Sequence, residues 1–252
     1  MALSGGTVPR SGETLLTFNR QFYDTLWSKA RLVSPEQFNT WPLIRPLLSH
    51  SARRLEVGPG LRPRLPIAGT FFVDISLPAL SRLRAAGGLA TMAVAGAIPF
   101  PDREFDLICV FDIIEHLDYD EAAFAELARV AKRGATLLLS APLYPARWTK
   151  FDDAVGHCRR YEPDQLLFKL RQHGFVVARS AGFGMRPRSL LLARLGLWFL
   201  ARGGQHAMWC YNAIMMPLAA RLQSGLQWRE GFVPTDTMDD VLLVCRRTDG
   251  PQ

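Results

Sequence analysis

Short apolar runs recur along the middle of the chain, and stretches with helical periodicity separate most of them. The runs lie at residues 53–57, 70–74, 89–94, 105–111 and 135–141. Continuous apolar runs of this length are typical of strands that are buried on both faces. Because such strands alternate here with helices, the pattern predicts an α/β fold with a mainly parallel sheet and helices on both faces.

The first helix that the pattern predicts covers residues 14–30. Its apolar residues recur at helical spacing, at Leu15, Phe18, Phe22, Tyr23, Leu26 and Trp27. In one interpretation this apolar face packs against the body of the protein. In the other, Tyr23 or Trp27 forms part of a lid over a ligand.

Two further helices have clear start and stop signals. One begins with Asp118 or Asp120 as its N-cap and stops just before Gly134. The other begins at Pro163, a residue favoured in the first turn, and ends before Gly174.

Residues 185–224 are densely apolar, but glycine, asparagine and proline interrupt them, so this segment is a poor transmembrane span. We expect two helices that form a cap over the substrate end of the protein. Arg188, Arg194 and Arg202 fall on one side of such a helix at 100° per residue. The stretch 188–220 could therefore instead rest on a membrane surface.

The chain has 252 residues, of which 48% are hydrophobic, enough for one large core. We therefore expect one α/β domain with helical additions. An N-terminal helical lid covers 1–50, the core covers 51–182 together with 237–248, and a helical cap or substrate insertion covers 183–236. The apolar run 239–246 supplies the last strand of the core.

Charge and cysteine usage narrow the class of protein. The formal net charge is +7, without a dense basic block, so nucleic acid is not expected as a partner. The four cysteines lie far apart and form no CxxC pair, which indicates a reduced compartment and no zinc site; we expect no metal. Residues 1–10 lack the apolar region of a signal peptide, so a cytoplasmic location is expected.

A glycine turn follows the first predicted strand. Gly58-Pro59-Gly60 comes directly after Leu55-Glu56-Val57, and the next apolar run ends at Asp74. Glycines at such a turn let the backbone approach a ligand, and an acid after the second strand reaches ribose hydroxyls. The pattern therefore predicts a nucleoside site at the carboxyl edge of the sheet. An NAD enzyme would have a third glycine where this chain has Pro63, which counts against NAD.

Several segments together carry a resemblance to a known family. They are Leu55-Glu56-Val57-Gly58-Pro59-Gly60, then Val73-Asp74-Ile75-Ser76, then the segments at 97–108, 111–117 and 156–161. In this order and spacing they resemble the class I S-adenosylmethionine-dependent methyltransferases, in the branch that acts on small molecules. The resemblance spans about residues 53 to 180.

The resemblance implies a Rossmann-like sheet of seven strands, the last of them antiparallel, and S-adenosylmethionine as the cofactor, with S-adenosylhomocysteine as the product. It also implies roles for individual residues. Glu56, Gly58, Pro59 and Gly60 would flank the methionine part, Asp74 would hold the ribose hydroxyls, Ile75 and Ala95 would contact adenine, and Asp112 and His116 would line the methionine end.

The sequence departs from the family pattern at two positions. Arg62 replaces the third glycine of the usual GxGxG, and Val94 stands where many members have an aspartate facing the adenine amino group. These changes bear on affinity more than on the identity of the cofactor. Asp112 and Glu115 could also be a helix-capping pair instead of ligands.

His157 is the candidate general base, because it lies in the polar segment 151–162 and an imidazole titrates near neutrality. Alternatively, His157 holds this loop by hydrogen bonds to Asp152 or Asp153. His116 could likewise pack under the edge of the sheet.

Tyr161 is the second catalytic candidate. With Arg159 and Arg160 it could orient an anionic acceptor, although Arg160 could simply pair with Glu162. The acceptor itself is expected to be a small or lipid-like molecule.

The sequence thus favours a methyltransferase. Two alternatives remain: a cofactor-binding partner protein without catalysis, and a peripheral membrane protein of the same fold.

Overall fold

The computed structural model describes residues 12–28, 30–183, 210, 213–214, 223, 225–232, 234 and 238–248. Most of the predicted cap at 183–236, and the arginines proposed for a membrane surface, lie outside these residues. None of the helices in the part of the chain that is described combines the length and the apolar character needed to cross a membrane.

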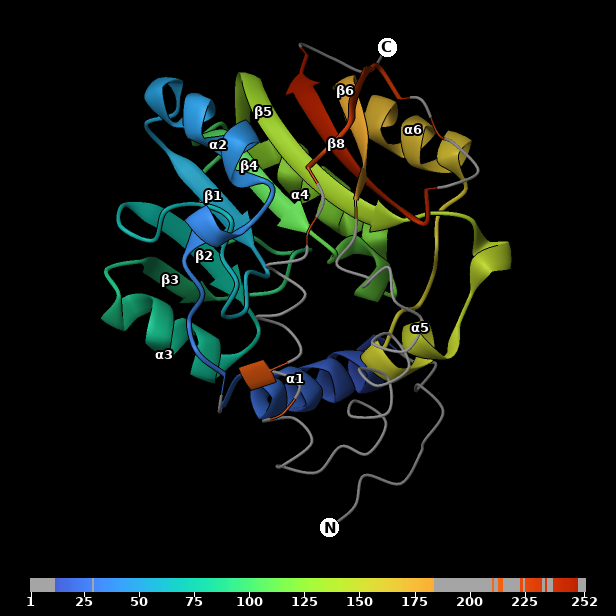
Figure 1. Cartoon of the computed structure of the whole chain (residues 1–252). Coiled ribbons are helices and arrows are strands. Elements are labelled where there is room, and N and C mark those ends of the chain that lie inside the picture. Colours follow the sequence, from blue (N-terminus) through green and yellow to red (C-terminus); the bar gives the residue numbers. More distant parts are fainter. Residues whose placement is uncertain are drawn as a thin grey trace.

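One mixed sheet forms the centre of the described structure (Figure 1). Its spatial order is β3-β2-β1-β4-β5-β8-β6-β7. The strands are β1 Arg54–Val57, β2 Thr70–Asp74, β3 Leu89–Met92, β4 Phe105–Phe111, β5 Ala131–Pro142, β6 Phe175–Phe183, β7 Trp228–Glu230 and β8 Asp240–Arg247.

Strands β1 to β5 are parallel, and β8 runs antiparallel to both β5 and β6. The predicted mainly parallel sheet with an antiparallel last strand is therefore confirmed. Strand β7 is an addition, which pairs antiparallel with the outer edge of β6. Trp228 of β7 lies under the guanidinium of Arg179, at 5.3 Å from the ring centre.

The helices are α1 Gly12–Ser28, α2 Trp41–Leu47, α3 Leu77–Ala85, α4 Asp120–Val130, α5 Lys150–Val155 and α6 Pro163–Gln172. Short 3₁₀ helices add η1 Pro35–Gln37, η2 Leu48–His50, η3 Ile114–His116 and η4 Pro145–Arg147.

Alternate residues of the central strands serve opposite faces of the sheet. On β4, Leu107 and Cys109 pack with the apolar residues of α2, while Ile108 and Val110 join the larger core under α4 and α6. Phe72 of β2 packs against α3. Helices thus cover both faces, and this burial explains why the strand sequences are apolar throughout.

Helix α4 differs from its predicted bounds. It ends at Val130, and β5 begins at Ala131 without a connecting loop. Its N-cap is Tyr119, whose side chain makes no capping bond. Asp120 instead accepts hydrogen bonds from the Tyr161 hydroxyl and from Lys169, so tertiary partners take the carboxylate that was predicted to cap the helix.

The connection from β1 to β2 contains no helix, and it carries Pro63 and Pro66, residues that disfavour the interior of a helix. The carboxylate of Glu56 holds this stretch by accepting hydrogen bonds from the backbone amides of Arg64 and Leu65, at 2.8 to 3.0 Å. The side chain of Glu56 therefore fixes the path of the chain after the glycine turn.

Helices α1 and α5 lie across the end of the sheet at which the parallel strands finish (Figure 1). Phe22, Leu26 and Trp27 of α1 pack with Leu61, Ala79 and Val155. The predicted amphipathic helix is confirmed, and its apolar face covers the edge where the candidate residues lie.

Candidate active site

The strand order reverses direction between β1 and β4, because β2 and β3 lie on one side of β1 and β5 lies beyond β4. Ligands of open α/β sheets bind outside the carboxyl ends of the strands at such a reversal. The glycine turn follows β1, Asp74 ends β2, and Asp112 follows β4. The predicted cofactor residues are thus gathered at one place.

Gly58 and Gly60 need to be glycine for two reasons. Both have positive φ values, 68° and 54°, a region that side chains other than glycine rarely adopt. A Cβ on Gly58 would lie 2.7 Å from Cγ1 of Ile113, and a Cβ on Gly60 would lie 2.8 Å from Nε1 of Trp27. The turn is therefore approached closely from both sides.

Asp74 is joined directly to the glycine turn. Its Oδ2 accepts a hydrogen bond from the amide of Gly60 at 2.9 Å, and its Oδ1 accepts one from Ser76 at 2.8 Å. Burial raises the pKa of this carboxyl to about 6, although the amides of Ser76 and Gly60 oppose the rise. A carboxylate accepts up to four hydrogen bonds, so Asp74 retains acceptor capacity for a diol.

Glu56 is held inside the protein instead of facing a ligand. Its side chain is 2% exposed, and the crossover amides use both of its oxygens. Burial raises its pKa to about 7, against the hydrogen bonds from Leu65 and Arg64. The structure supports a positioning role for Glu56.

The remaining cofactor candidates occupy different environments. Ile75 is half-buried beside Asp74, and Ala95 is buried in the main core. Asp112 is exposed and has a φ of 53°, which is unusual for a residue other than glycine. Its Oδ1 accepts a hydrogen bond from the hydroxyl of Ser140 at 2.6 Å, which fixes the carboxylate at the end of β4.

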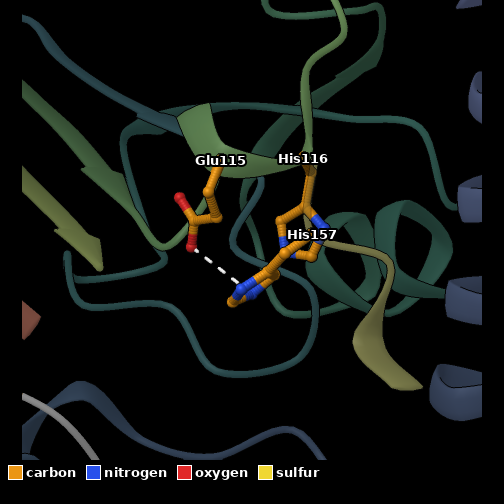
Figure 2. Close-up of side chains that lie close together, drawn as sticks. All are labelled: Glu115, His116 and His157. Atoms are coloured by element: carbon orange, nitrogen blue, oxygen red, sulfur yellow. Dashed lines mark ion pairs between the residues drawn. The ribbon is translucent and has the colours of Figure 1, made fainter. Parts of the chain in front are cut away.

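Glu115, His116 and His157 come together beside this edge (Figure 2). The two imidazole rings meet edge to face, with centroids 4.7 Å apart. Nε2 of His157 lies 3.8 Å from Oε1 of Glu115. Burial raises the pKa of Glu115 well above its usual value, and burial lowers the pKa of His116 to about 3.

Asp152 of α5 organises the loop that carries His157. It accepts hydrogen bonds from Nδ1 of His157 at 2.9 Å and from the guanidinium of Arg160 at 2.9 and 3.1 Å. Burial raises the pKa of Asp152, but hydrogen bonds from His157, Thr149 and Arg160 outweigh it and hold the pKa below the usual range. His157 thus makes the loop contact considered as the alternative, and Arg160 pairs with Asp152 instead of Glu162.

Tyr161 lies in the core. Its side chain is fully buried, and its hydroxyl donates toward Asp120 at 2.7 Å and toward the carbonyl of Ile114 at 3.2 Å. Burial and the neighbouring Asp120 raise the pKa of the phenol. These contacts support a structural role for Tyr161, away from any acceptor.

Helix α1 contributes residues to this edge. The hydroxyl of Tyr23 lies 3.1 Å from Nε2 of His116, and Asn19 donates to the carbonyl of His116. Trp27 covers Gly60, and the guanidinium of Arg62 lies 4.9 Å from the centre of its ring. Sequence reasoning left Glu115 open between a ligand and a helix cap, and it did not predict that Glu115 lies beside His157.

A separate small cavity of about 170 Å³ lies between Arg103, Arg129 and Arg247. These residues flank the start of β4, the start of β5 and the end of β8, which is the amino edge of the parallel strands. It therefore lies at the edge opposite to the glycine turn.

Comparisons with known proteins agree with this geometry. Residues 55–139 match the protein family described as "Methyltransferase domain". Two curated relatives from two strains of Mycobacterium tuberculosis, each named as a probable S-adenosylmethionine-dependent methyltransferase, are 34% identical to this chain over 96 residues. That stretch covers 36% of this chain, and the chain spans only about a third, 34%, of the length of these relatives.

Solved structures share the fold. An S-adenosylmethionine-dependent methyltransferase from Thermotoga maritima is 16% identical, with a TM-score of 0.55 over 92% of both chains. Another from Mesorhizobium loti is 17% identical, with a TM-score of 0.52 over 85% of this chain and 100% of that one. The [4+2]-cyclase SpnF is 20% identical, with a TM-score of 0.50 over 79% of this chain and 75% of that one.

Proposed function

We propose that the chain transfers a methyl group from S-adenosylmethionine to a small-molecule acceptor, because residues 55–139 match the "Methyltransferase domain" family and the two curated relatives are named as probable S-adenosylmethionine-dependent methyltransferases. The acceptor side would lie between the glycine turn and the Glu115–His116–His157 cluster. A lipid-like acceptor stays a prediction. Contact with a membrane surface through 188–220 also stays a prediction, because most of this stretch lies outside the described residues.

The hydrogen bond from the amide of Gly60 to Asp74 carries this proposal, because it joins the acid of β2 to the turn after β1. Asp74 would accept hydrogen bonds from both ribose hydroxyls. The backbone of residues 58–60 would flank the amino-acid tail, while Ile75 and Ala95 would line the adenine side. Asp112 and His116 would lie at the methionine end, and Glu56 would hold the turn from behind.

S-adenosylmethionine, when bound, supplies an activated methyl group on a positively charged sulfur. The task of the protein is then to align the acceptor with that methyl group and to exclude water. Orientation of this kind can contribute on the order of 7–11 kcal/mol to the rate. Trp27 and Tyr23 of α1 cover this edge of the sheet, which suits the exclusion of water.

His157 would serve at the acceptor side. Asp152 accepts a hydrogen bond from the protonated Nδ1, so Nε2 is the nitrogen that could take a proton from an acceptor. This arrangement keeps the imidazole oriented, in the manner of a histidine held by a buried carboxylate.

Calorimetry with S-adenosylhomocysteine tests the cofactor assignment. We expect the wild-type protein to bind, and Asp74→Asn to bind more than about tenfold more weakly, because buried polar groups lose their charged partner. Asp102→Asn makes the same change of charge on an exposed acid at the opposite edge and should leave binding unchanged. Equal binding by all three proteins, or no binding by the wild type, would contradict the assignment.

A second candidate keeps the fold without methyl transfer. Trp27 lies against Gly60, so α1 covers the glycine turn. A helix that covers the turn would limit the entry of an acceptor, which also suits a partner protein that binds the cofactor without methyl transfer. Incubation with methyl-labelled S-adenosylmethionine and a panel of small acceptors distinguishes the two. Transfer of label to an acceptor excludes the second candidate, whereas cofactor binding with no transfer favours it.

A further inference from the structure

Three side chains with acceptor atoms face one another between η3 and the loop after α5. They are Glu115, His116 and His157, and one ligand atom of each lies within 4.8 Å of the others (Figure 2). Each side chain is at most 9% exposed. The cluster is therefore shielded from water.

The hydrogen bonds around His157 fix its tautomer. Nδ1 lies 2.9 Å from Oδ1 of Asp152, which also accepts from Arg160 and therefore acts as a carboxylate. A carboxylate only accepts, so the proton of the ring sits on Nδ1. Nε2 is left with its lone pair, 3.8 Å from Oε1 of Glu115. When Glu115 is ionised, two acceptors face each other across this gap.

His116 has the same arrangement. Its Nδ1 lies 3.2 Å from the backbone carbonyl oxygen of Gly156, which can only accept a hydrogen bond, so Nδ1 carries the ring proton. Its Nε2 therefore also carries a lone pair, and the hydroxyl of Tyr23 approaches it at 3.1 Å. The hydroxyl of Tyr23 has one hydrogen to donate. It can therefore serve only one acceptor among Nε2 of His116, Nε2 of His157 and the carboxylate of Glu115.

Glu115 shows the imbalance most clearly. Its side chain is fully buried, and neither carboxylate oxygen has a hydrogen-bond partner among the described residues. A buried polar group without a partner costs free energy, and a buried charge costs more unless it is paired or coordinates a metal. Asp112, Asp152 and Asp240 act on Glu115 with charges of the same sign. A divalent cation bound beside Glu115 would supply the opposite charge that these three aspartates do not.

We propose that Glu115, His116 and His157 bind a divalent transition-metal ion, with Zn²⁺ as the representative member. In the metal-bound protein, Nε2 of His157 holds the ion and is no longer available as a general base. Two imidazoles and one carboxylate are a donor set that suits such ions better than Mg²⁺ or Ca²⁺. This proposal departs from the expectation of no metal, which rested on the lack of paired cysteines and did not consider ligands from histidine and glutamate. Three protein ligands leave a further coordination position for water or for an acceptor oxygen.

The geometry fits this assignment. Ligand atoms about 2.0–2.2 Å from one ion lie no more than about 4.4 Å apart, so the 3.8 Å between His157 and Glu115 is within reach. The outer limit of 4.8 Å in the cluster requires a shift of a few tenths of an ångström. Asp152 and the carbonyl of Gly156 hold the two Nδ1 protons, as outer partners of metal-bound histidines do.

Metal titration of the full chain, made metal-free and carrying no polyhistidine tag, tests the proposal. Co²⁺ should bind with a ratio of about one per chain and give visible absorption, and Zn²⁺ should displace it whereas excess Mg²⁺ should not. Glu115→Gln and His157→Gln should each weaken Zn²⁺ binding by at least about tenfold, since even outer partners of a metal contribute that much.

His173→Gln is the matched control. It removes a partly buried histidine that also faces a glutamate, Glu121, but lies outside the cluster. This variant should bind Zn²⁺ as the wild type does. No Co²⁺ or Zn²⁺ binding by the wild type, or unchanged binding by Glu115→Gln, would overturn the proposal.

Thermal melting checks that the variants fold and gives a second readout. Zn²⁺ should raise the melting temperature of the wild type and of His173→Gln but not of Glu115→Gln. Without metal, Glu115→Gln should melt no lower than the wild type, because it removes a buried carboxylate that has no partner. A Zn²⁺-dependent rise in Glu115→Gln equal to that of the wild type counts against the site.

The metal site and the methyl transfer can fail separately. S-adenosylhomocysteine should bind the metal-free wild type and Glu115→Gln alike, because Glu115 is not assigned to the cofactor and this change keeps His116, the residue assigned to both sites. Zn²⁺ binding without S-adenosylhomocysteine binding would sink the proposed function and leave the metal site standing. The converse would sink the metal site alone.

Discussion

The indole of Trp27 lies against Gly60 of the glycine turn. A Cβ on Gly60 would lie 2.8 Å from Nε1 of that indole, so only glycine admits this contact. Trp27 is itself 7% exposed. The contact holds α1 against the turn after β1. A ligand therefore reaches the turn more easily when α1 is held less firmly.

Gly60→Ala should loosen α1. The new methyl group would add the cost of a positive φ, about 1 kcal/mol, to a clash with Trp27. We expect faster hydrogen exchange across residues 12–28 and a lower melting temperature. Gly87→Ala has the same backbone strain, with φ 88°, but meets nothing within 4 Å. Equal exchange of α1 in both variants would show that the contact is not what holds the helix.

Trp27→Leu should speed the association of S-adenosylhomocysteine, because the indole occupies space beside the turn that the ligand would approach. If opening of α1 costs about 1.4 kcal/mol, removal of that cost gives roughly tenfold faster association. Stopped-flow binding measures this rate. Trp148→Leu, at a partly exposed tryptophan away from α1, is the control. Slower association in Trp27→Leu would mean that the indole attracts the ligand.

Binding of S-adenosylhomocysteine should weaken at low pH. Burial raises the pKa of Asp74 to about 6, so the carboxylate that accepts ribose hydroxyls is progressively protonated below that pH. The affinity should be level above about pH 7 and then fall by up to about tenfold per unit below pH 6. Calorimetry from above about pH 7 to below about pH 6 measures the slope, and in Asp74→Asn the slope should disappear.

The same raised pKa acts on folding in the opposite sense. A carboxyl whose folded pKa lies above its unfolded value contributes stability below the unfolded pKa, and this contribution is lost as the pH rises through about 6. Ligand binding therefore favours the ionised Asp74, whereas the empty fold favours the protonated one.

Tyr161→Phe should lower stability and leave cofactor binding unchanged. The hydroxyl is buried between Asp120 and the carbonyl of Ile114, so its loss should cost about 1–3 kcal/mol in the free energy of unfolding. Denaturant unfolding measures this change. Tyr119→Phe, at an exposed residue of the same type, should cost nothing. A loss of methyl transfer in Tyr161→Phe at unchanged stability would instead favour the catalytic role predicted from the sequence.

Asp152→Asn should be among the most destabilising single changes in the loop. It leaves the buried guanidinium of Arg160 without a charged partner, which typically costs about 3–5 kcal/mol. Asp153→Asn changes the neighbouring exposed carboxylate, whose partner is Trp148, and should have little effect. Similar unfolding free energies for the two variants would contradict the role given to Asp152.

The sheet could be predicted from the sequence because its strands are continuous apolar runs. β1, β2 and β4 lie within one residue of their predicted bounds. The end of α4 was misplaced, since Ala131 is apolar in either a helix or a strand and periodicity cannot separate the two. Strand β7 was missed because its only strong signal, Trp228, lies in a segment predicted to be helical.

Site residues could be predicted where they follow from strand ends and backbone conformation. Contacts between side chains that are distant in the sequence could not. Gly58, Gly60 and Asp74 could be read from strand ends and glycine spacing. The pairing of Asp152 with Arg160 could not, because Glu162 was an equally good partner in sequence. The cluster of Glu115 with His157 depends on the loop after α5 folding back beneath η3, which no local pattern specifies.

The helix-free connection after β1 affects which charge on a ligand the backbone amides at this edge can stabilise. A Rossmann dinucleotide site presents free amides at the positive end of a helix, which anchor a diphosphate bridge. Here the amides of Gly60, Arg64 and Leu65 are already donated to the carboxylates of Asp74 and Glu56. These three amides therefore offer no anchor to a polyanionic ligand, and they present no free dipole that would oppose a ligand with a cationic sulfur.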